Sequence, residues 1–313
     1  MASVTVVVPS YRRQADLGRC LAGLAAQVPE PLEVLVALRA DDVEGRRVAT
    51  KSKGVRIVAV EQPGHLPPLA AALTVASGDV VAMIDDDAVP RPGWIECLTR
   101  EFDDPAVAGL CGPVLEHSRP ATPDQGARAV RRLVRRRSRT LYRAFAGLPD
   151  PDACARAGLA ELGRIPVEAA NGGNMAFRRS VLAAIKLDMG LNRGAAIGYE
   201  ADLCLGACRH GGVWFHPELA VDHWPGQRVG APEREERQRY MEDYSYNLWY
   251  IAAKHFARWE QIVFRSYMWA VGQRASPGVV RRLVPGSSNL RLPLAAARRE
   301  GSRAGRAARR AAH

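Results

Sequence analysis

Short apolar runs alternate with helical patterns along the first half of the chain. Four runs rich in β-branched and aliphatic residues predict strands at residues 4–8, 32–38, 55–60 and 80–84. Between them, leucines recur at helical spacing in residues 17–24, and residues 65–76 and 92–102 have further helical patterns. Strands that alternate with helices predict an α/β fold with a mainly parallel central sheet flanked by helices.

Polar residues follow three of the predicted strands, directly where each strand ends. They are Pro9, Ser10 and Tyr11, then residues 39–42, then Asp85, Asp86 and Asp87. Ligands of parallel sheets bind at the carboxyl ends of the strands, so we expect these residues to line one cleft. The first strand is not followed by a glycine-rich phosphate loop, which disfavours a dinucleotide site or a P-loop. Carboxylates in its place favour a metal-bridged phosphate.

The three carboxylates leave two interpretations open when they are taken alone. Acids at the end of a buried strand repel one another and resist desolvation, so a cation or a polar ligand usually compensates them. A bare acidic turn is the other interpretation, and the triplet by itself fits both equally. Motifs elsewhere in the chain favour the binding site.

Four stretches, in order, make residues 4–224 resemble a family 2 glycosyltransferase with the GT-A fold. The stretches are residues 6–11, residues 77–94 with the acidic triplet, residues 172–179, and residues 198–223. The resemblance implies a GT-A type nucleotide-diphospho-sugar transferase fold with a C-terminal helical extension. It implies transfer of a sugar from a nucleotide-diphospho-sugar to an acceptor hydroxyl by metal-assisted single displacement with inversion.

The resemblance assigns the chemistry of the leaving group to the acidic triplet. In the family the final aspartate of the triplet ligates the metal, so Asp87 is the expected ligand of Mn²⁺ or Mg²⁺. His223 matches a histidine that often joins it as a ligand or phosphate contact, although a lone histidine is more often structural. Asp85 and Asp86 are expected to contact the ribose, the sugar or a metal-bound water. The cation would neutralise charge on the departing diphosphate.

The family's catalytic base matches Glu200, at the start of a predicted helix. A carboxylate within hydrogen-bond reach can take the proton from the acceptor hydroxyl. Asp202 would orient Glu200, bind the acceptor or cap the helix. The alternative is that both acids are there because they favour a helix N-terminus.

Binding of the nucleotide-sugar is expected from the remaining strand-end residues and from a glycine-containing turn at residues 171–174. The expected contacts are Pro9, Ser10, Tyr11, Arg39, Asp85, Asp86 and Asn174. An ordinary turn is the alternative for residues 171–174. The second strand of the family usually ends in an aspartate that contacts the nucleobase, but here Leu38 and Arg39 align, with Asp41 and Asp42 later. UDP is the default donor nucleotide, and GDP and dTDP stay open.

The chain also contains two basic segments and one stretch rich in aromatic residues. The net charge is +11, yet residues 128–143 hold eight arginines and residues 291–313 seven, so the rest of the chain is slightly acidic. We expect peripheral membrane contact through these two segments, with a solvated surface helix as the alternative. Residues 240–269 hold ten aromatics and are expected to pack as a C-terminal helix, with interfacial anchoring as the alternative. Nucleic-acid binding is not expected, because stacking aromatics are not interleaved with the arginines.

These patterns predict three regions and a location. Residues 1–230 are expected to form the catalytic domain, residues 231–275 an aromatic-rich helical region, and residues 276–313 a basic, partly disordered tail. Scattered cysteines, and the lack of a signal segment or of an apolar run long enough to span a bilayer, favour a cytoplasmic protein, peripheral at the inner face of the membrane. The acceptor is expected to be lipid-linked, a polysaccharide or a small natural product.

Two other functions stay open. A nucleotidyltransferase also uses an α/β sheet with paired acids, but it would need a glycine- and lysine-rich loop near the first strand, and residues 9–13 are not one. A catalytically silent GT-A-like protein could bind membranes or polyanions through its arginine-rich segments. The intact set of acids argues against that alternative.

Overall fold

The structure, a computed structural model, describes most of the 313-residue chain. The described residues are 1–117, 148–149, 164–224, 234–273, 276–279 and 294–311. The arginine-rich segment 128–143 lies outside them. The chain divides into two compact units, of which the first comprises Met1–Leu187 and Leu203–Gln227 and the second comprises Asp188–Asp202 and Arg228–His313.

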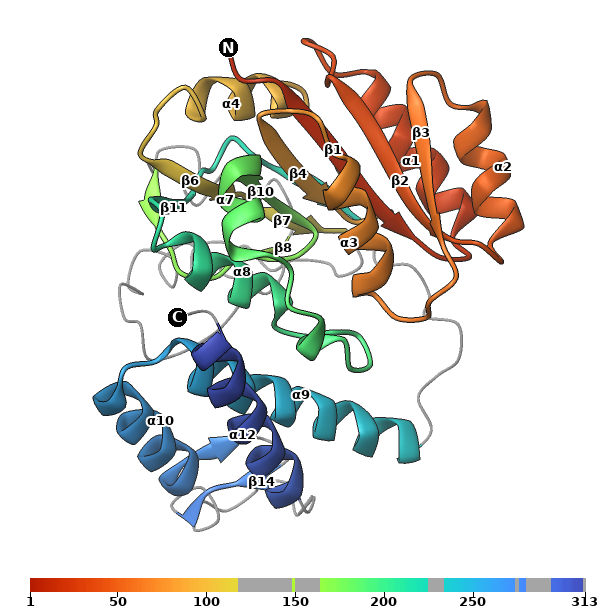
Figure 1. The fold of residues 1–313 in the computed structure, drawn as a ribbon. Coiled ribbons are helices and arrows are strands. Elements are labelled where there is room, and N and C mark those ends of the chain that lie inside the picture. The colour runs from red at the N-terminus through yellow and green to blue at the C-terminus, as the bar shows by residue number, and fades with distance from the viewer. Residues whose placement is uncertain (118–147, 150–163, 225–233, 274–275, 280–293, 312–313) are drawn as a thin grey trace. The chain divides into compact units, whose positions relative to one another are not determined.

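The first unit is built on an eight-stranded sheet with the strand order β3-β2-β1-β4-β10-β6-β11-β9 (Figure 1). The strands are β1 (Val4–Ser10), β2 (Glu33–Arg39), β3 (Val55–Val60), β4 (Val80–Ile84), β6 (Val107–Cys111), β9 (Ile165–Pro166), β10 (Asn174–Arg178) and β11 (Gly212–Phe215). The first four strands pair in parallel, and β10 runs antiparallel to both β4 and β6. The expected α/β fold with a mostly parallel central sheet is confirmed.

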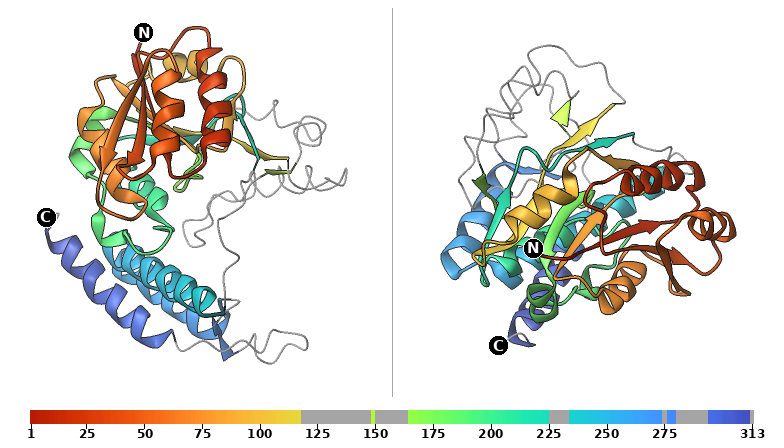
Figure 2. Two further views of the ribbon diagram at one scale, coloured as in Figure 1. Left: turned by 90° about the vertical axis from the view of Figure 1, so that its right-hand side faces the viewer. Right: turned by 90° about the horizontal axis from the view of Figure 1, so that it is seen from above.

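Helices cover both faces of this sheet. Helices α1 (Gln14–Ala25) and α2 (Val43–Lys51) lie on one side and α3 (Leu66–Val75) on the other (Figure 2). Helix α4 (Trp94–Glu101) joins α1 and α2 in one hydrophobic cluster, and α7 (Arg179–Ile185) follows β10 directly. Because both faces are covered, the central strands are apolar throughout and not alternating, which is why their sequences are continuous apolar runs.

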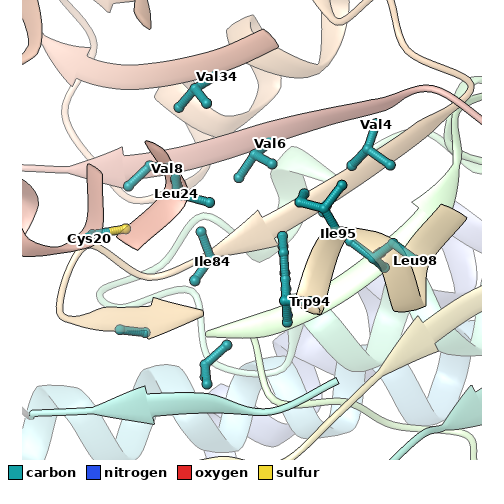
Figure 3. Packing of buried hydrophobic residues seen from close by; sticks show 14 of the residues in the cluster. Val4, Val6, Val8, Cys20, Leu24, Val34, Ile84, Trp94, Ile95 and Leu98 are labelled. Carbon is teal, nitrogen blue, oxygen red and sulfur yellow. The ribbon is translucent and has the colours of Figure 1, made fainter. Parts of the chain in front are cut away.

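The main core lies between the central strands and the helices α1, α2 and α4. Alternate residues of β1, namely Val4, Val6 and Val8, point toward this side, and Leu24 of α1 and Ile95 of α4 pack near them (Figure 3). All of these side chains are buried. This packing fixes the carboxyl ends of β1 and β4 next to each other, since the two strands are paired neighbours.

A smaller sheet lies beside that edge. Its strand order is β5-β12-β7-β8, with β5 (Ala88–Pro90), β7 (Val114–Glu116), β8 (Leu148–Pro149) and β12 (Val221–His223). Strand β5 follows β4 after only three residues, the acidic triplet. The small sheet therefore begins where the predicted ligand site lies.

The second unit is helical. It contains the short 3-10 helix η2 (Met189–Leu191), the first residues of α8 (Tyr199–Ala207), α9 (Arg234–His255), α10 (Arg258–Ala270), the short pair β13 (Gly272–Gln273) and β14 (Ser276–Pro277), and α12 (Ala295–Ala311). Helix α12 runs alongside α9 (Figures 1 and 2). None of the described helices combines the length and the apolar character that crossing a bilayer requires.

Helix α12 lies in the stretch that was expected to be a basic, partly disordered tail. It packs on α9 through Gly301 and Gly305, which are buried. A Cβ atom at Gly301 would come within 2.3 Å of the Tyr246 carbonyl oxygen, and one at Gly305 within 2.1 Å of the Tyr250 carbonyl oxygen. Small residues thus form the packing face, so this helix has no apolar stripe of large side chains to reveal it in the sequence.

Candidate active site

The acidic triplet lies at the carboxyl edge of the large sheet, where β4 ends. Strand β5 pairs antiparallel with β12 so that Ala88 lies opposite His223. This pairing brings Nε2 of His223 to 3.0 Å from Oδ1 of Asp87. Both residues are at least partly buried. Two positions far apart in the sequence, which the resemblance had assigned to one site, are thus brought together.

Asp85, Asp87 and His223 form a group whose donor atoms fit a divalent cation. One ligand atom from each lies within 4.8 Å of the other two. Carboxylate oxygens are the donors that Mg²⁺ and Mn²⁺ prefer, and an imidazole nitrogen suits many transition-metal ions. Nδ1 of His223 is buried without a hydrogen-bond partner among the described residues, whereas its Nε2 faces the carboxylate of Asp87.

The negative charge of the triplet is only partly balanced. Burial, reinforced by the charges of Asp87 and Asp86, raises the pKa of Asp85 to about 6. Burial also raises the pKa of Asp86, although hydrogen bonds from Ser10 and Arg13 oppose the shift. Burial would lower the pKa of His223, but its hydrogen bond to Asp87 and the nearby carboxylates outweigh this and raise it. A cation bound here would relieve the repulsion between the carboxylates.

Arg13 supplies the positive charge that the protein itself places on the triplet. Its Nη1 donates to Oδ1 of Asp86 at 2.8 Å and to Oδ2 of Asp87 at 2.7 Å. Ser10, at the end of β1, donates its hydroxyl to Oδ2 of Asp86 at 2.7 Å. Sequence reasoning included Ser10 but missed Arg13. The position of Arg13 in the sequence could have indicated this contact, because Arg13 lies in the loop after β1, at the same sheet edge as the triplet.

Tyr11 and Arg39 meet at the ends of β1 and β2, as expected for neighbouring strands. The guanidinium carbon of Arg39 lies 4.7 Å from the centre of the Tyr11 ring, and that of Arg12 lies 5.0 Å from it. The Tyr11 hydroxyl donates to Oδ2 of Asp41 at 3.1 Å. The cluster presents cationic groups, an aromatic ring and a carboxylate, which together can stack on and hydrogen-bond a nucleobase.

Asp42, the other acid after β2, has a structural role. Its Oδ1 accepts a hydrogen bond from the backbone N–H of Gly45 at 2.9 Å and caps helix α2. Its Oδ2 accepts from the backbone N–H of Arg12 at 2.6 Å. Because both oxygens are engaged and the residue is buried, Asp41 is the acid of this pair that is placed to meet a ligand.

Asn174 is buried, and its amide is used inside the protein. Its Oδ1 accepts from the indole N–H of Trp94 at 3.1 Å, and its Nδ2 donates to the carbonyl oxygens of Pro113 and Leu219. These three hydrogen bonds hold the amide of Asn174 inside the fold. Gly173 is the residue of this turn that approaches the triplet, since a Cβ atom there would lie 2.7 Å from Oδ2 of Asp85.

Glu200 and Asp202, the predicted acids for the acceptor side, belong to the second unit. Glu200 is half-buried at the start of α8, and its Oε2 accepts from the backbone N–H of Gly198 at 3.2 Å. Gly198 has a φ angle of +97°, a conformation that favours glycine. The turn before α8 thus fixes the backbone directly in front of Glu200.

Asp202 is buried in a network of charged side chains. Its Oδ2 accepts from Nζ of Lys254 at 2.8 Å, and its Oδ1 lies 2.7 Å from Nε2 of His255. Lys254 also donates to Asp188 at 2.7 Å, and the hydroxyl of Tyr250 donates to the same carboxylate at 2.8 Å. Sequence reasoning missed Lys254 and His255, which lie about 50 positions away at the C-terminal end of α9. The network ties the start of α8 to α9 within the second unit.

A second group of possible metal ligands has a simpler explanation. Donor atoms of Cys97, His216 and Glu218 lie within 4.8 Å of one another. Arg100, however, already donates to Oε2 of Glu218 at 2.7 Å and lies 3.7 Å from Sγ of Cys97. Burial raises the pKa of the Cys97 thiol to about 12, so the thiol is neutral. A guanidinium group therefore occupies this cluster, and it connects α4 to the loop after β11.

Solved structures share this fold at low sequence identity. The mannosyltransferase PcManGT from Pyrobaculum calidifontis, solved with GDP-Man and Mn²⁺, matches with a TM-score of 0.51 and 17% identity, covering 87% of this chain and 71% of that one. Residues 1–349 of TarS from S. aureus, solved with UDP-GlcNAc, match with a TM-score of 0.53 and 12% identity, covering 85% and 72%. These likenesses support the GT-A fold.

Sequence comparison identifies the family. A glucosyl-dolichyl phosphate glucuronosyltransferase from Haloferax volcanii is 30% identical over 118 residues, 36% of this chain. The matched stretch spans only 38% of that relative's length. Residues 5–164 match the family described as Glycosyl transferase family 2, and this match covers half of the chain. The chain belongs to glycosyl transferase family 2.

Proposed function

We propose that this protein is a glycosyltransferase that moves a sugar from a nucleotide-diphospho-sugar to an acceptor hydroxyl. The observation that carries the proposal is the group Asp85, Asp87 and His223 at the carboxyl edge of the sheet, with donor atoms within 4.8 Å of one another. PcManGT, which has the same fold, was solved with GDP-Man and Mn²⁺. We propose that Asp87 and His223, with Asp85 beside them, hold Mn²⁺ or Mg²⁺ here. When bound, the ion would supply positive charge to the departing diphosphate.

Neighbouring side chains orient the carboxylates that are proposed to act on the departing diphosphate. Arg13 and Ser10 fix the carboxylates of Asp86 and Asp87 through hydrogen bonds of 2.7–2.8 Å, so these carboxylates are held in one orientation before any ligand arrives. The guanidinium of Arg13 is also a cation that can contact phosphate oxygens. Pro9, a partly buried residue of β1, directly precedes Ser10 in the strand.

Glu200 is proposed as the base that takes the proton from the acceptor hydroxyl. This role gives single displacement with inversion, because the acceptor attacks directly as the nucleoside diphosphate leaves. Asp202 is proposed to position the start of α8, since Lys254 and His255 already occupy its two oxygens. Of the three roles that the sequence left open for Asp202, positioning is the one that this geometry supports.

The nucleobase is proposed to lie against Tyr11 and Arg39. A guanidinium group next to an aromatic ring can donate to base carbonyl oxygens while the ring stacks. Asp41 can accept a hydrogen bond from a ring N–H, a group that uracil, thymine and guanine all present. UDP, GDP and dTDP donors therefore all remain in the proposal, and a donor panel separates them.

A lipid-linked acceptor is supported by the relative from Haloferax volcanii, a glucosyl-dolichyl phosphate glucuronosyltransferase. A polysaccharide or a small natural product would present the same hydroxyl chemistry. The expected peripheral membrane contact at the cytoplasmic face stays a proposal, and residues 128–143 lie outside the described structure. Within residues 291–313, Arg299, Arg303, Arg306 and Arg310 form an exposed stripe along α12, which would suit anionic headgroups.

A thermal-shift panel tests the proposed function. UDP, GDP and dTDP are each added with Mn²⁺, with Mg²⁺ or with EDTA, and we expect at least one nucleotide to raise the melting temperature only when a metal is present. The nucleotide that does so then identifies the sugar donors to assay for transfer. A panel in which no nucleotide gives a metal-dependent shift would favour the catalytically silent alternative. Incorporation of a nucleoside monophosphate into product would instead indicate a nucleotidyltransferase.

A further inference from the structure

Helix α10 presents an exposed apolar face. Trp259 is 59% exposed, Ile262 is 65% exposed and Trp269 is 69% exposed. Val263 and Tyr267 are also exposed. The spacings of three, four and seven residues place these side chains on one broad side of the helix. Exposed apolar residues scattered singly need no explanation, but five on one helical face form a patch.

The opposite side of α10 is already packed, so the exposed face is not needed for folding the helix onto its unit. Phe264 makes edge contacts with Trp249 of α9 at 5.1 Å between ring centres and with Phe256 at 6.0 Å. Met268 is buried. A helix with one packed apolar side normally carries polar residues on its other side. In α10 most of those positions are apolar or aromatic.

The charges on α10 make this face positive. Arg258 and Arg265 are exposed and lie seven residues apart, next to Ile262 and Trp269 along the helix. The acid of the helix, Glu260, accepts a hydrogen bond from the backbone N–H of Ala257 at 2.7 Å and so serves as a cap. The apolar face therefore has arginines along one margin, and the helix's acid is engaged at its N-terminus.

We propose that the exposed face of α10 docks on the surface of an anionic lipid bilayer. Tryptophan and tyrosine rings favour the boundary between headgroups and acyl chains, and arginines at the margin would pair with anionic headgroups. A second protein copy would also bury apolar area, but a self-complementary contact would bring arginines of both copies together and gain no opposite charge. The proposal is independent of catalysis and does not require the sugar-transfer reaction.

Vesicle co-sedimentation of the full chain tests this docking. Vesicles of pure phosphatidylcholine are compared with vesicles that contain about 30% phosphatidylglycerol, at low and high salt. We expect binding to the anionic vesicles that weakens with salt. The double variant W259S/W269S should lower vesicle affinity at least about tenfold, because it removes two rings that are exposed in the free protein and would be buried at the bilayer boundary on docking. The variant R258Q/R265Q should weaken binding and reduce its salt dependence.

The matched control is Leu32→Ser, which removes an apolar side chain that is 57% exposed in the first unit and should leave vesicle binding unchanged. Circular dichroism and the nucleotide thermal shift show whether each variant is folded. Equal vesicle binding by W259S/W269S and by the unmodified protein would overturn the proposal. Failure of the unmodified protein to bind anionic vesicles would overturn it too. Sedimentation velocity adds a third arm: a dimer that W259S/W269S abolishes would assign the face to a second copy.

Discussion

Asp87 uses both of its carboxylate oxygens inside the protein. One faces His223 and the other accepts a hydrogen bond from Arg13. A cation that binds here would compete with the guanidinium group for Oδ2, since both are positive and seek the same oxygen. Binding of metal and a shift of Arg13 toward a phosphate are therefore expected to be coupled.

Asp87→Ala should abolish the metal-dependent thermal shift produced by the nucleotide. It removes the carboxylate that lies between His223 and Arg13, so His223 loses this partner and Arg13 is left with Asp86. Sugar transfer, measured by release of the nucleoside diphosphate, should fall by about 10²-fold or more. Asp103→Asn, at a residue whose side chain is 57% exposed, is the control and should behave as the original protein. Retention of a full metal-dependent shift in Asp87→Ala would exclude Asp87 as the ligand.

Glu200→Gln should remove turnover while leaving nucleotide binding intact. An amide of similar shape can keep the contact with the N–H of Gly198 but cannot take a proton. We expect kcat to fall by about 10²–10⁴-fold, with an unchanged nucleotide thermal shift. Glu61→Gln, at an exposed site, controls for loss of a carboxylate. Near-normal turnover in the Glu200→Gln variant would show that another group is the base.

Asp202 makes the stability of the second unit depend on pH. Burial would raise the pKa of Asp202, but the hydrogen bond from His255 and the charges of His255 and Lys254 outweigh it and hold the pKa below its ordinary value of 3.8. The folded state thus binds this proton less readily than the unfolded state does. The stabilisation is complete above the unfolded pKa of about 3.9 and is lost as pH falls through the lower folded pKa.

Lys254→Met should therefore cost more stability at neutral pH than in acid. Removing one partner of a buried ion pair costs about 3–5 kcal/mol where the remaining carboxylate is charged. Urea denaturation at pH 7 and near pH 3 measures the difference, and Lys51→Met, at an exposed position, is the control. The same loss at both pH values would mean that packing of the lysine stem, and not its charge, is what stabilises the network.

At the scale of elements, the helices and strands that could be predicted from the sequence are those with many large apolar residues. Strands β1, β2 and β4 were predictable because they are buried on both faces and consist of continuous apolar runs. Helix α2 was not, because only the small residues Gly45 and Ala49 are buried in it, and of its two valines Val43 is exposed and Val48 is partly buried. Helix α12 was not predicted for a related reason, since its buried residues are the small Gly301, Ser302 and Gly305.

For the candidate site, the sequence predicts the residues of local motifs but not the residues that contact them from distant positions. The acidic triplet and Glu200 are predicted from motifs, which are local in the sequence. Motifs do not identify Arg13, Lys254 and His255. Each of these residues contacts a partner about 50–75 positions away in the sequence. Asn174 shows a further limit: its motif is local in the sequence, but the motif does not indicate that its amide accepts a hydrogen bond from the buried Trp94.

Gly305→Val should destabilise the packing of α12 on α9. The new side chain would start 2.1 Å from the carbonyl oxygen of Tyr250, so the two helices must separate or the side chain must distort. We expect a loss of about 1–3 kcal/mol in the free energy of unfolding, measured by denaturant titration. Ala307→Val, on the exposed side of the same helix, carries the same β-branched cost without the clash. Equal effects of the two variants would show that α12 does not depend on close approach.

At the scale of the whole molecule, the two units are not consecutive along the chain. Asp188–Asp202 belongs with the C-terminal helices, whereas Leu203–Gln227 belongs with the sheet and includes His223. The sequence predicts one boundary at residues 230–231, whereas the sheet unit ends at Gln227 and the helical unit includes a stretch that precedes this point. No local composition change marks residue 188, because the association depends on contacts made with α9.

A chain that ends at residue 227 should fold poorly, although it retains the whole of the first unit. Asp202 would lose both Lys254 and His255, and Asp188 would lose Lys254 and Tyr250. We expect such a chain to be less soluble and to melt at a lower temperature than the full chain, measured by light scattering during heating. A truncated chain as stable as the full protein would show that Asp188–Asp202 does not require the C-terminal helices.

The interrupted order also limits how this protein can exchange parts with its relatives. A recombination point anywhere between residues 203 and 227 would inherit Asp188 and Asp202 from one parent and Lys254 and His255 from the other. Such hybrids keep the network of charged side chains only if both parents have it. Asp188–Asp202 and the C-terminal end of α9 are therefore expected to change together over time. Grafting new C-terminal helices onto this scaffold therefore means transplanting Asp188–Asp202 with them.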